Sequence, residues 1–285
     1  MDKKEIEQFV KQIDEADAIL VGAASGMSAA AGHRHYYERD EVFIREYSEY
    51  EKKYGFHCTF DGFYYRYKSE RQRWAFIAHN NQVIINSPAG QPYYDLHTLL
   101  KDKTFFVLTT NQDTMFNQIL PEEKIAAIQG DDRFVQCGRP CCDELWDAVE
   151  LTKKMDAMID ENLEIPEDMV PRCPHCGAVM EPWVRGYNFL EGTRYKKERE
   201  KWQQFVVEHQ NEKILFLELG VGRMTPMFIQ EPFWNLTYNI PKAFYININP
   251  KDALLPKELK DKGMAIHEDI AEVLIEAVKM KNNNI

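Results

Sequence analysis

Short, uninterrupted apolar runs recur along the chain and are separated by segments with helical periodicity. The runs cover residues 18–22, 105–110, 214–220 and 243–248, with weaker ones at 125–129 and 264–267. Runs of this length without polar alternation are typical of strands buried on both faces of a parallel sheet. Because helical patterns separate them, including a closing amphipathic helix at 268–280, the sequence predicts an α/β fold with a doubly wound, Rossmann-like parallel sheet.

The chain length limits the number of domains. Its 285 residues are enough for one large α/β domain with a small module inserted in it. Residues 132–182 interrupt the strand and helix alternation with short cysteine spacings, prolines and turn residues. We therefore expect a small module at 132–182 and a discontinuous main domain made of residues 1–131 and 183–285. The aromatic and charged segment at about 36–80 is expected to form helices over one end of the sheet.

Charge and hydropathy restrict the classes of partner. The formal net charge of −11 disfavours nonspecific binding to nucleic acid or to anionic membranes. The basic segments at 66–73 and 194–202 fit solvated helix faces, a local basic patch being the alternative. No stretch approaches the roughly 20 apolar residues of a membrane span, and residues 1–20 lack the pattern of an export signal. We expect a cytoplasmic protein that binds neither nucleic acid nor membranes.

The cysteines fall into two close groups that suit a metal. Cys137 and the adjacent Cys141 and Cys142 form one group, and the CxxC pair Cys173 and Cys176 forms the other. Four thiolates can enclose a structural zinc tetrahedrally, and a reducing compartment favours this over disulfides. We favour Cys141 over Cys142 as the fourth ligand, because adjacent side chains seldom reach the same metal. A redox CxxC is the alternative, but it leaves the upstream group unexplained.

Small residues directly follow the first predicted strand. The segment AILVGAASGMSAAAG places Gly22, Ala23, Gly26 and Ser28 where a backbone can approach a pyrophosphate and present N–H groups to it. Tight packing of a strand against a helix would select the same small residues. These residues are therefore candidates for a nucleotide site that need support from elsewhere in the chain.

Polar residues and glycines follow the later strands. Asn111 and Asp113 in TTNQD come after the second strong strand, Gly220 and Gly222 after the third, and Asn249 after the fourth. Ligands bind outside the carboxyl ends of strands in open α/β sheets, so these residues could face one crevice. Helix capping by the first two and ordinary turns at the others are the alternatives.

Taken in order, these motifs resemble the sirtuin family over most of the chain. GAASGMS is similar to the NAD-binding GAGIS with two extra residues, and TTNQD is similar to TQNxD. The match implies that Asn111 is the catalytic asparagine and Asp113 the nicotinamide-binding aspartate. GVGRMTP stands where the family has GTSLxVxP, Asn249 matches the asparagine that contacts adenosine, and HEDIAEVL places Asp269 near the adenine-side aspartate. The resemblance implies that the main domain binds NAD and that four-cysteine zinc ligation occurs at the expected place.

Three segments depart from the pattern of deacetylating sirtuins. Gln129 in IQGD replaces the histidine of the HG motif, HRHYY at 33–37 replaces PDFR, and EPWVRGYNFLEG at 181–192 replaces the RPxVVxFGE substrate loop. These departures resemble a divergent microbial class, class M, associated with ADP-ribosylation of a lipoyl carrier protein and with a partner macrodomain.

The departures imply a particular kind of chemistry. A glutamine does not titrate near neutrality, so Gln129 can position the ribose or acceptor but cannot serve as the base of a deacetylase. Opening of the nicotinamide bond does not depend on that base. We expect an NAD-consuming protein ADP-ribosyltransferase that uses Asn111, Gln129 and Arg185, with Arg185 orienting an acidic acceptor or the cofactor unless it is a surface arginine. The alternative functions are an NAD glycohydrolase or deacylase and a noncatalytic NAD sensor. An alternative source of a base is His33 or His35.

Overall fold

The computed structural model describes residues 2–283 and contains a six-stranded parallel sheet with the order β3-β2-β1-β7-β8-β9. The strands are β1 (Ala18–Ala23), β2 (Thr104–Thr109), β3 (Ile125–Ala127), β7 (Ile214–Leu219), β8 (Phe244–Ile248) and β9 (Gly263–Ile266). Each apolar run, including the two weaker ones, forms a strand of this sheet. The predicted α/β fold class is confirmed.

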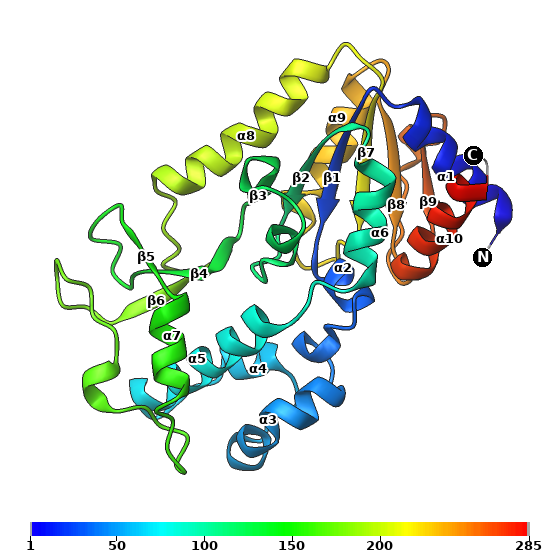
Figure 1. Cartoon of the computed structure of the whole chain (residues 1–285). Helices are drawn as coiled ribbons and strands as arrows, with labels where there is room; N and C mark the ends of the chain where they lie inside the picture. The colour runs from blue at the N-terminus through cyan, green and yellow to red at the C-terminus, as the bar shows by residue number, and fades with distance from the viewer. Residues whose placement is uncertain (1, 284–285) are drawn as a thin grey trace.

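Helices cover both faces of the sheet (Figure 1). Alternate residues of the strands therefore pack into two separate cores, one on each face. In β1, Val21 packs into one core and Leu20 into the other. The helices of the first face are α1 (Lys3–Glu15), α6 (Gln91–Leu100) and α10 (Ile270–Asn283); those of the second are α8 (Thr193–His209) and α9 (Gln230–Asn239). No helix between residues 2 and 283 is both long and apolar enough to cross a membrane.

A second group of elements lies beyond the carboxyl ends of the parallel strands (Figure 1). It contains a three-stranded antiparallel sheet with the order β5-β4-β6. Its elements are α3 (Glu41–Tyr54), α4 (Thr59–Phe63), α5 (Glu70–Asn86), β4 (Gly130–Cys137), β5 (Leu145–Asp147), α7 (Val149–Asp156) and β6 (Met180–Val184). Trp74 and Ala75 of α5 share a hydrophobic core with Val135, Met155 and Ile165. The helical segment at 36–80 therefore packs against the cysteine-bearing segment.

Polar contacts and one close backbone approach position β4. The Asn81 side chain on α5 donates from Nδ2 to the Asp132 carbonyl at 2.6 Å and accepts from the Thr152 hydroxyl at 2.8 Å. Gly130 has φ +102°, and a Cβ at this position would lie 1.9 Å from the Trp183 carbonyl oxygen. Only glycine fits this approach. The start of β4 is thereby held against both α5 and β6.

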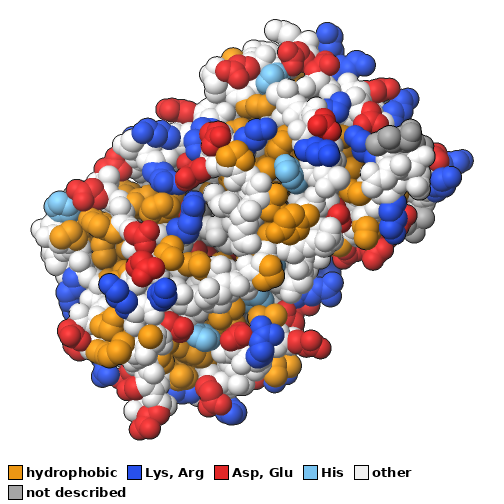
Figure 2. All heavy atoms as spheres, in the orientation of Figure 1, with side chains coloured by type: hydrophobic (Ala, Val, Ile, Leu, Met, Phe, Trp, Pro, Cys, Tyr) orange, Lys and Arg blue, Asp and Glu red, His pale blue; other side chains and the backbone are white. Residues whose placement is uncertain are grey.

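The basic segments predicted from the sequence are interspersed with acidic partners. In α8, Arg194 pairs with Glu122, and Lys201 lies 3.0 Å from Glu198. Figure 2 shows Lys and Arg side chains mixed with Asp and Glu side chains on the face that it presents. Arg194 and Lys201 of α8 thus have local carboxylate partners.

Candidate active site

Loops after parallel strands enclose a cavity of 390 Å³ at the carboxyl edge of the sheet. Because parallel strands all end at this edge, motifs far apart in the chain meet there. Its lining includes the predicted residues Gly26, Ser28, Asn111, Asp113, Gly220, Gly222, Asn249 and Asp269. We call this the first cavity.

Two of the predicted small residues lie outside the cavity lining. Gly22 and Ala23 are inside the buried strand β1. A Cβ at Gly22 would lie 2.3 Å from Ile229 and 2.6 Å from the Phe233 ring. The small residue at 22 therefore permits packing of α9 on the sheet, which is the alternative that the sequence left open.

The loops after β1 and β7 touch through their glycines. A Cβ at Gly26 would lie 2.6 Å from the Cα of Gly220, whose φ is +65°. Gly26 also donates its N–H to the Gly220 carbonyl at 3.1 Å. A Cβ at Gly222, in contrast, would enter open space. The backbone of this wall is thus exposed to whatever occupies the first cavity.

Ser28 joins the polar residues at the centre of the first cavity. Its hydroxyl donates to Asp113 Oδ2 at 2.5 Å, accepts from Asn111 Nδ2 at 2.9 Å and lies 3.0 Å from the Tyr93 hydroxyl. Asn111 Nδ2 also donates to the Ala24 carbonyl at 3.0 Å. Burial raises the pKa of the Asp113 carboxyl, while the bond from Ser28 opposes this rise. The Asn111 side chain is therefore oriented toward the loop after β1.

Asp113, Asn249 and Asp269 line the first cavity and also form hydrogen bonds with the backbone of nearby loops. Asp113 Oδ1 accepts from the backbone of Met115 at 3.1 Å, so this residue caps a turn as well as lining the cavity. Asn249 Nδ2 donates to the Val221 carbonyl at 2.9 Å. Asp269 accepts from the Ala271 backbone at 2.8 Å at the start of α10. These carboxylates and amides hold the loops that surround the first cavity.

A second cavity of 320 Å³ adjoins the first. Its lining contains Gln129, Arg185 and aromatic side chains. The aromatic members are Tyr36, Tyr37, Phe60, Phe63, Tyr64 and Phe228. The two cavities share part of their lining, and Asn111 and Asp132 are among the shared residues. Gln129 is only 8% exposed, and its Nε2 has no hydrogen-bond partner among the described residues.

Arg185 enters the second cavity with its guanidinium partly engaged. Nη1 donates to Glu191 at 2.5 Å and Nη2 to the Ile128 carbonyl at 3.3 Å. The guanidinium also lies 4.1 Å from the centre of the Phe189 ring. Its buried Nε has no partner within residues 2–283. Arg185 is thus a side chain held in a fixed position in the lining of the second cavity.

The two histidines considered as bases line only the first cavity. The His33 ring nitrogen Nε2 lies 2.9 Å from the Pro88 carbonyl oxygen. Burial lowers the pKa of His35, although Asp40 opposes this effect. Neither ring lines the second cavity with Gln129.

Four cysteine sulfurs gather at the end of the antiparallel sheet. The Sγ atoms of Cys137, Cys141, Cys173 and Cys176 all lie within 4.8 Å of one another. The Cys137–Cys176 and Cys141–Cys173 sulfurs are each 3.5 Å apart. Four sulfurs bound to one zinc at the usual bond length would lie about 3.8 Å apart. The donor set and spacing therefore fit a metal, with Cys142 outside the set.

Comparison with known proteins identifies relatives that span the chain. No protein-family profile matches it. A Sir2 homologue solved with NAD has a TM-score of 0.61 and 15% identity, covering 98% of this chain and 94% of that one. A Sir2 homologue variant solved with ADP-ribose has a TM-score of 0.59 and 16% identity, covering 100% and 98%. These likenesses show the fold.

The sequence relatives decide the family. The chain is 30% identical over 290 residues to the protein ADP-ribosyltransferase of Staphylococcus aureus, covering 99% of this chain and 91% of the relative. The chain belongs to the sirtuin-like protein ADP-ribosyltransferases. A probable bifunctional ADP-ribose hydrolase/ADP-ribosyltransferase of Fusarium oxysporum is 27% identical over 265 residues, which are 89% of this chain and 44% of that longer protein.

Two residues of this sirtuin-like transferase were not identified from the sequence motifs: Asp132 lines the first cavity, and Tyr93 contacts the lining residue Ser28. Tyr93 lies on α6 among apolar residues, so its pattern indicates only core packing. Asp132 falls at the boundary of the segment that the sequence assigns to the cysteine-bearing module. The only available signal was the adjacent carboxylate pair Asp131 and Asp132 directly after Gly130, which by itself is typical of a turn.

Proposed function

We propose that the chain is an NAD-dependent enzyme that breaks the bond to nicotinamide and transfers ADP-ribose to a protein acceptor. The position of Asn111 is the observation that supports this proposal most directly. Its side chain lies where the first cavity meets the second, so a group bound in one can reach a group bound in the other. Membership of the protein ADP-ribosyltransferases supports the reaction type.

In this proposal NAD occupies the first cavity, where its adenosine end lies near Asn249 and Asp269. The exposed backbone at Gly26, Gly220 and Gly222 suits the close approach of a pyrophosphate. Ser28 holds Asn111 and Asp113 beside the nicotinamide end by the hydrogen bonds described above. Polar groups held in place in this way lose little freedom when the substrate binds.

The acceptor occupies the second cavity. Gln129 offers an unpartnered amide N–H there, and Arg185 offers a buried Nε–H. Both can position oxygen atoms, and neither can remove a proton near neutral pH. The site therefore favours transfer to a side chain over deacetylation, which needs a base at the ribose hydroxyls. A NAD glycohydrolase, which uses water as acceptor, is the second candidate because the second cavity can also admit water.

Further parts of the proposal concern partners and the metal. We propose a lipoyl carrier protein as acceptor and a macrodomain protein as partner; the naming of one relative as both ADP-ribose hydrolase and transferase supports a linked removal step. The four cysteines would hold one structural zinc with no open position for catalysis. Free thiols in such a set suit the reducing cytoplasm.

NAD labelled in its adenylate portion tests the reaction type. We expect wild-type enzyme incubated with host lysate to release nicotinamide and to leave label on a protein. Free labelled ADP-ribose without protein labelling would indicate a glycohydrolase. Binding of NAD without nicotinamide release would indicate a sensor, and robust turnover of acetyl-lysine peptides without protein labelling would overturn the transferase assignment.

Variants of the central residues test the site. Asn111→Ala and Asp113→Ala are expected to abolish nicotinamide release while the zinc content stays that of wild type and both variants still fold. Asn239→Ala, an exposed position on α9, is the matched control and should retain full turnover. Wild-type turnover in both cavity variants would show that these residues serve only to cap their loop.

A further inference from the structure

Asp132 occupies a position that no other carboxylate shares. Several carboxylates line the first cavity, but among the described residues only Asp132 lines the second as well. Like Asn111, it therefore lies at the junction where the two cavities share their lining. The ribose carbon that exchanges nicotinamide for the acceptor must lie at this junction, because both groups have to reach it.

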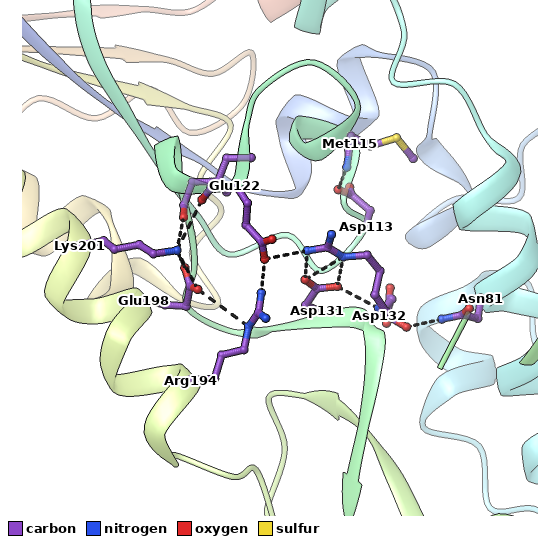
Figure 3. A network of polar contacts seen from close by, with 11 residues as sticks. Asn81, Asp113, Met115, Glu122, Asp131, Asp132, Arg194, Glu198 and Lys201 are labelled. Atoms are coloured by element: carbon purple, nitrogen blue, oxygen red, sulfur yellow. Dashed lines mark hydrogen bonds and ion pairs between the residues drawn. The ribbon is translucent and has the colours of Figure 1, made fainter. Parts of the chain in front are cut away.

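The neighbouring Asp131 has a different environment. Its carboxylate accepts from the Arg133 side chain at 2.6, 3.0 and 3.1 Å, and Arg133 continues to Glu122 at 3.5 Å. Figure 3 shows this network running from Asp131 through Glu122 toward Arg194 on α8. Asp132 contacts Asn81 only through its backbone carbonyl. No side chain within residues 2–283 donates a hydrogen bond to its carboxylate.

The charges around Asp132 disfavour its ionised form. Burial, followed by the nearby Asp131 and Asp113 carboxylates, raises the pKa of Asp132 well above its ordinary value. Tyr36 and Tyr47 face it from other elements, and burial raises the pKa of both phenols, so both stay neutral and do not compensate its charge. Asp132 is partly buried, and a carboxylate in such surroundings without a compensating partner costs folding free energy and is typical of functional sites.

A second observation at the same place indicates a ligand. Gln129 is more than nine-tenths buried, lines the second cavity together with Asp132, and has an amide nitrogen without a partner. The lining of the second cavity thus contains a buried hydrogen-bond donor and a carboxylate, and neither has a side-chain partner among residues 2–283. Together they suit a group that accepts from Gln129 and presents positive charge or hydroxyls to Asp132.

We propose that Asp132 is a catalytic residue that stabilises the positive charge at the nicotinamide ribose as its bond to nicotinamide breaks. This inference rests on the proposed function. In the step, the C1′–N bond breaks and its electron pair passes to the nicotinamide nitrogen, while the acceptor donates the pair that forms the new bond to C1′. Asp132 acts in its ionised form, and in this step it accepts no proton. A proton released by a hydroxyl acceptor passes to water, and a carboxylate acceptor has none to release.

Asp132→Asn tests the proposal because it keeps the shape and removes the charge. Loss of one preorganised electrostatic contact is expected to lower nicotinamide release by about 100-fold. NAD affinity, measured by equilibrium titration, should change by less than about tenfold, because the contact acts mainly in the transition state. The melting temperature should rise at neutral pH, because the variant removes a carboxylate whose charge is repelled by Asp131 and Asp113.

The pH profile separates this role from a structural one. Wild-type nicotinamide release should rise with pH as Asp132 ionises, and the profile of Asp132→Asn should be flatter. Asp131→Asn is the matched control: it should lower the melting temperature by breaking the pair with Arg133 but keep the rise with pH.

The outcomes distinguish this inference from the proposed function. Full nicotinamide release by Asp132→Asn, alongside an inactive Asn111→Ala, would overturn the role of Asp132 alone. Full release by Asn111→Ala would overturn the proposed function itself. A lower melting temperature for Asp132→Asn with an unchanged pH profile would assign Asp132 a structural role and also overturn the inference.

Discussion

Glu218 is a buried carboxyl whose protonation should control the stability of the sheet. It is 0% exposed in β7, two residues before Gly220 of the first cavity. Its oxygens accept from Gln230 Nε2 at 2.8 Å and from the Tyr245 hydroxyl at 2.7 Å. Burial raises the pKa of Glu218 from 4.5 to about 7, and the two hydrogen bonds only partly oppose this rise.

The raised pKa sets the sign and the size of a pH effect. Because the carboxyl binds its proton more tightly in the folded than in the unfolded chain, its contribution to stability is complete below pH 4.5 and is lost as pH rises through about 7. A difference from 4.5 to about 7 corresponds to about 3 kcal/mol, at roughly 1.4 kcal/mol per pH unit. Glu218→Gln removes the ionisation, and its amide can still bond to both Gln230 and Tyr245.

Urea unfolding at several pH values checks this prediction. Between about pH 5 and pH 8.5 the unfolding free energy of Glu218→Gln is expected to rise by about 2 to 3 kcal/mol relative to wild type, with an unchanged denaturant slope. Glu208→Gln, at an exposed position on α8, should show no such change. Parallel pH curves for wild type and Glu218→Gln, or a less stable variant at pH 8.5, would refute the reasoning.

Three other perturbations address the metal, the nucleotide loop and the acceptor side. Cys173→Ser should lose bound zinc and melt at lower temperature because structural zinc supplies folding free energy, whereas Cys142→Ser should keep both; metal analysis showing equal zinc in the two variants would contradict this. Gly26→Ala should destabilise the fold by about 1–3 kcal/mol and weaken NAD binding, because its Cβ would lie 2.6 Å from the Gly220 Cα. Melting curves and NAD titration curves unchanged from wild type would argue against that contact. Gln129→Ala should lower transfer by up to about 100-fold through looser positioning and leave zinc content unchanged, and Gln129→His should not gain deacetylation of acetylated peptides. A wild-type transfer rate in Gln129→Ala would remove this residue from the site.

Local pattern was enough to predict the sheet and the order of its motifs. The run at 18–22 is apolar throughout because both of its faces are buried, and it forms β1. The short spacings among Cys137, Cys141, Cys173 and Cys176 likewise predicted the set that the structure brings together. Each strand and each of the two cysteine groups consists of residues close in sequence, so periodicity and spacing reveal them.

Which candidates meet, and in what environment, was decided by packing between distant segments. Gly22 and Gly26 carry the same local signal, yet Gly22 contacts α9 and Gly26 lines the first cavity. Asp131 and Asp132 are adjacent in sequence, but only Asp131 meets an arginine side chain. The burial and charge around Asp132 depend on elements distant in sequence, here α5 and the loop after β2. The sequence alone therefore determined the fold and the class of chemistry, while the three-dimensional arrangement determined which carboxylate stands at the junction of the two cavities.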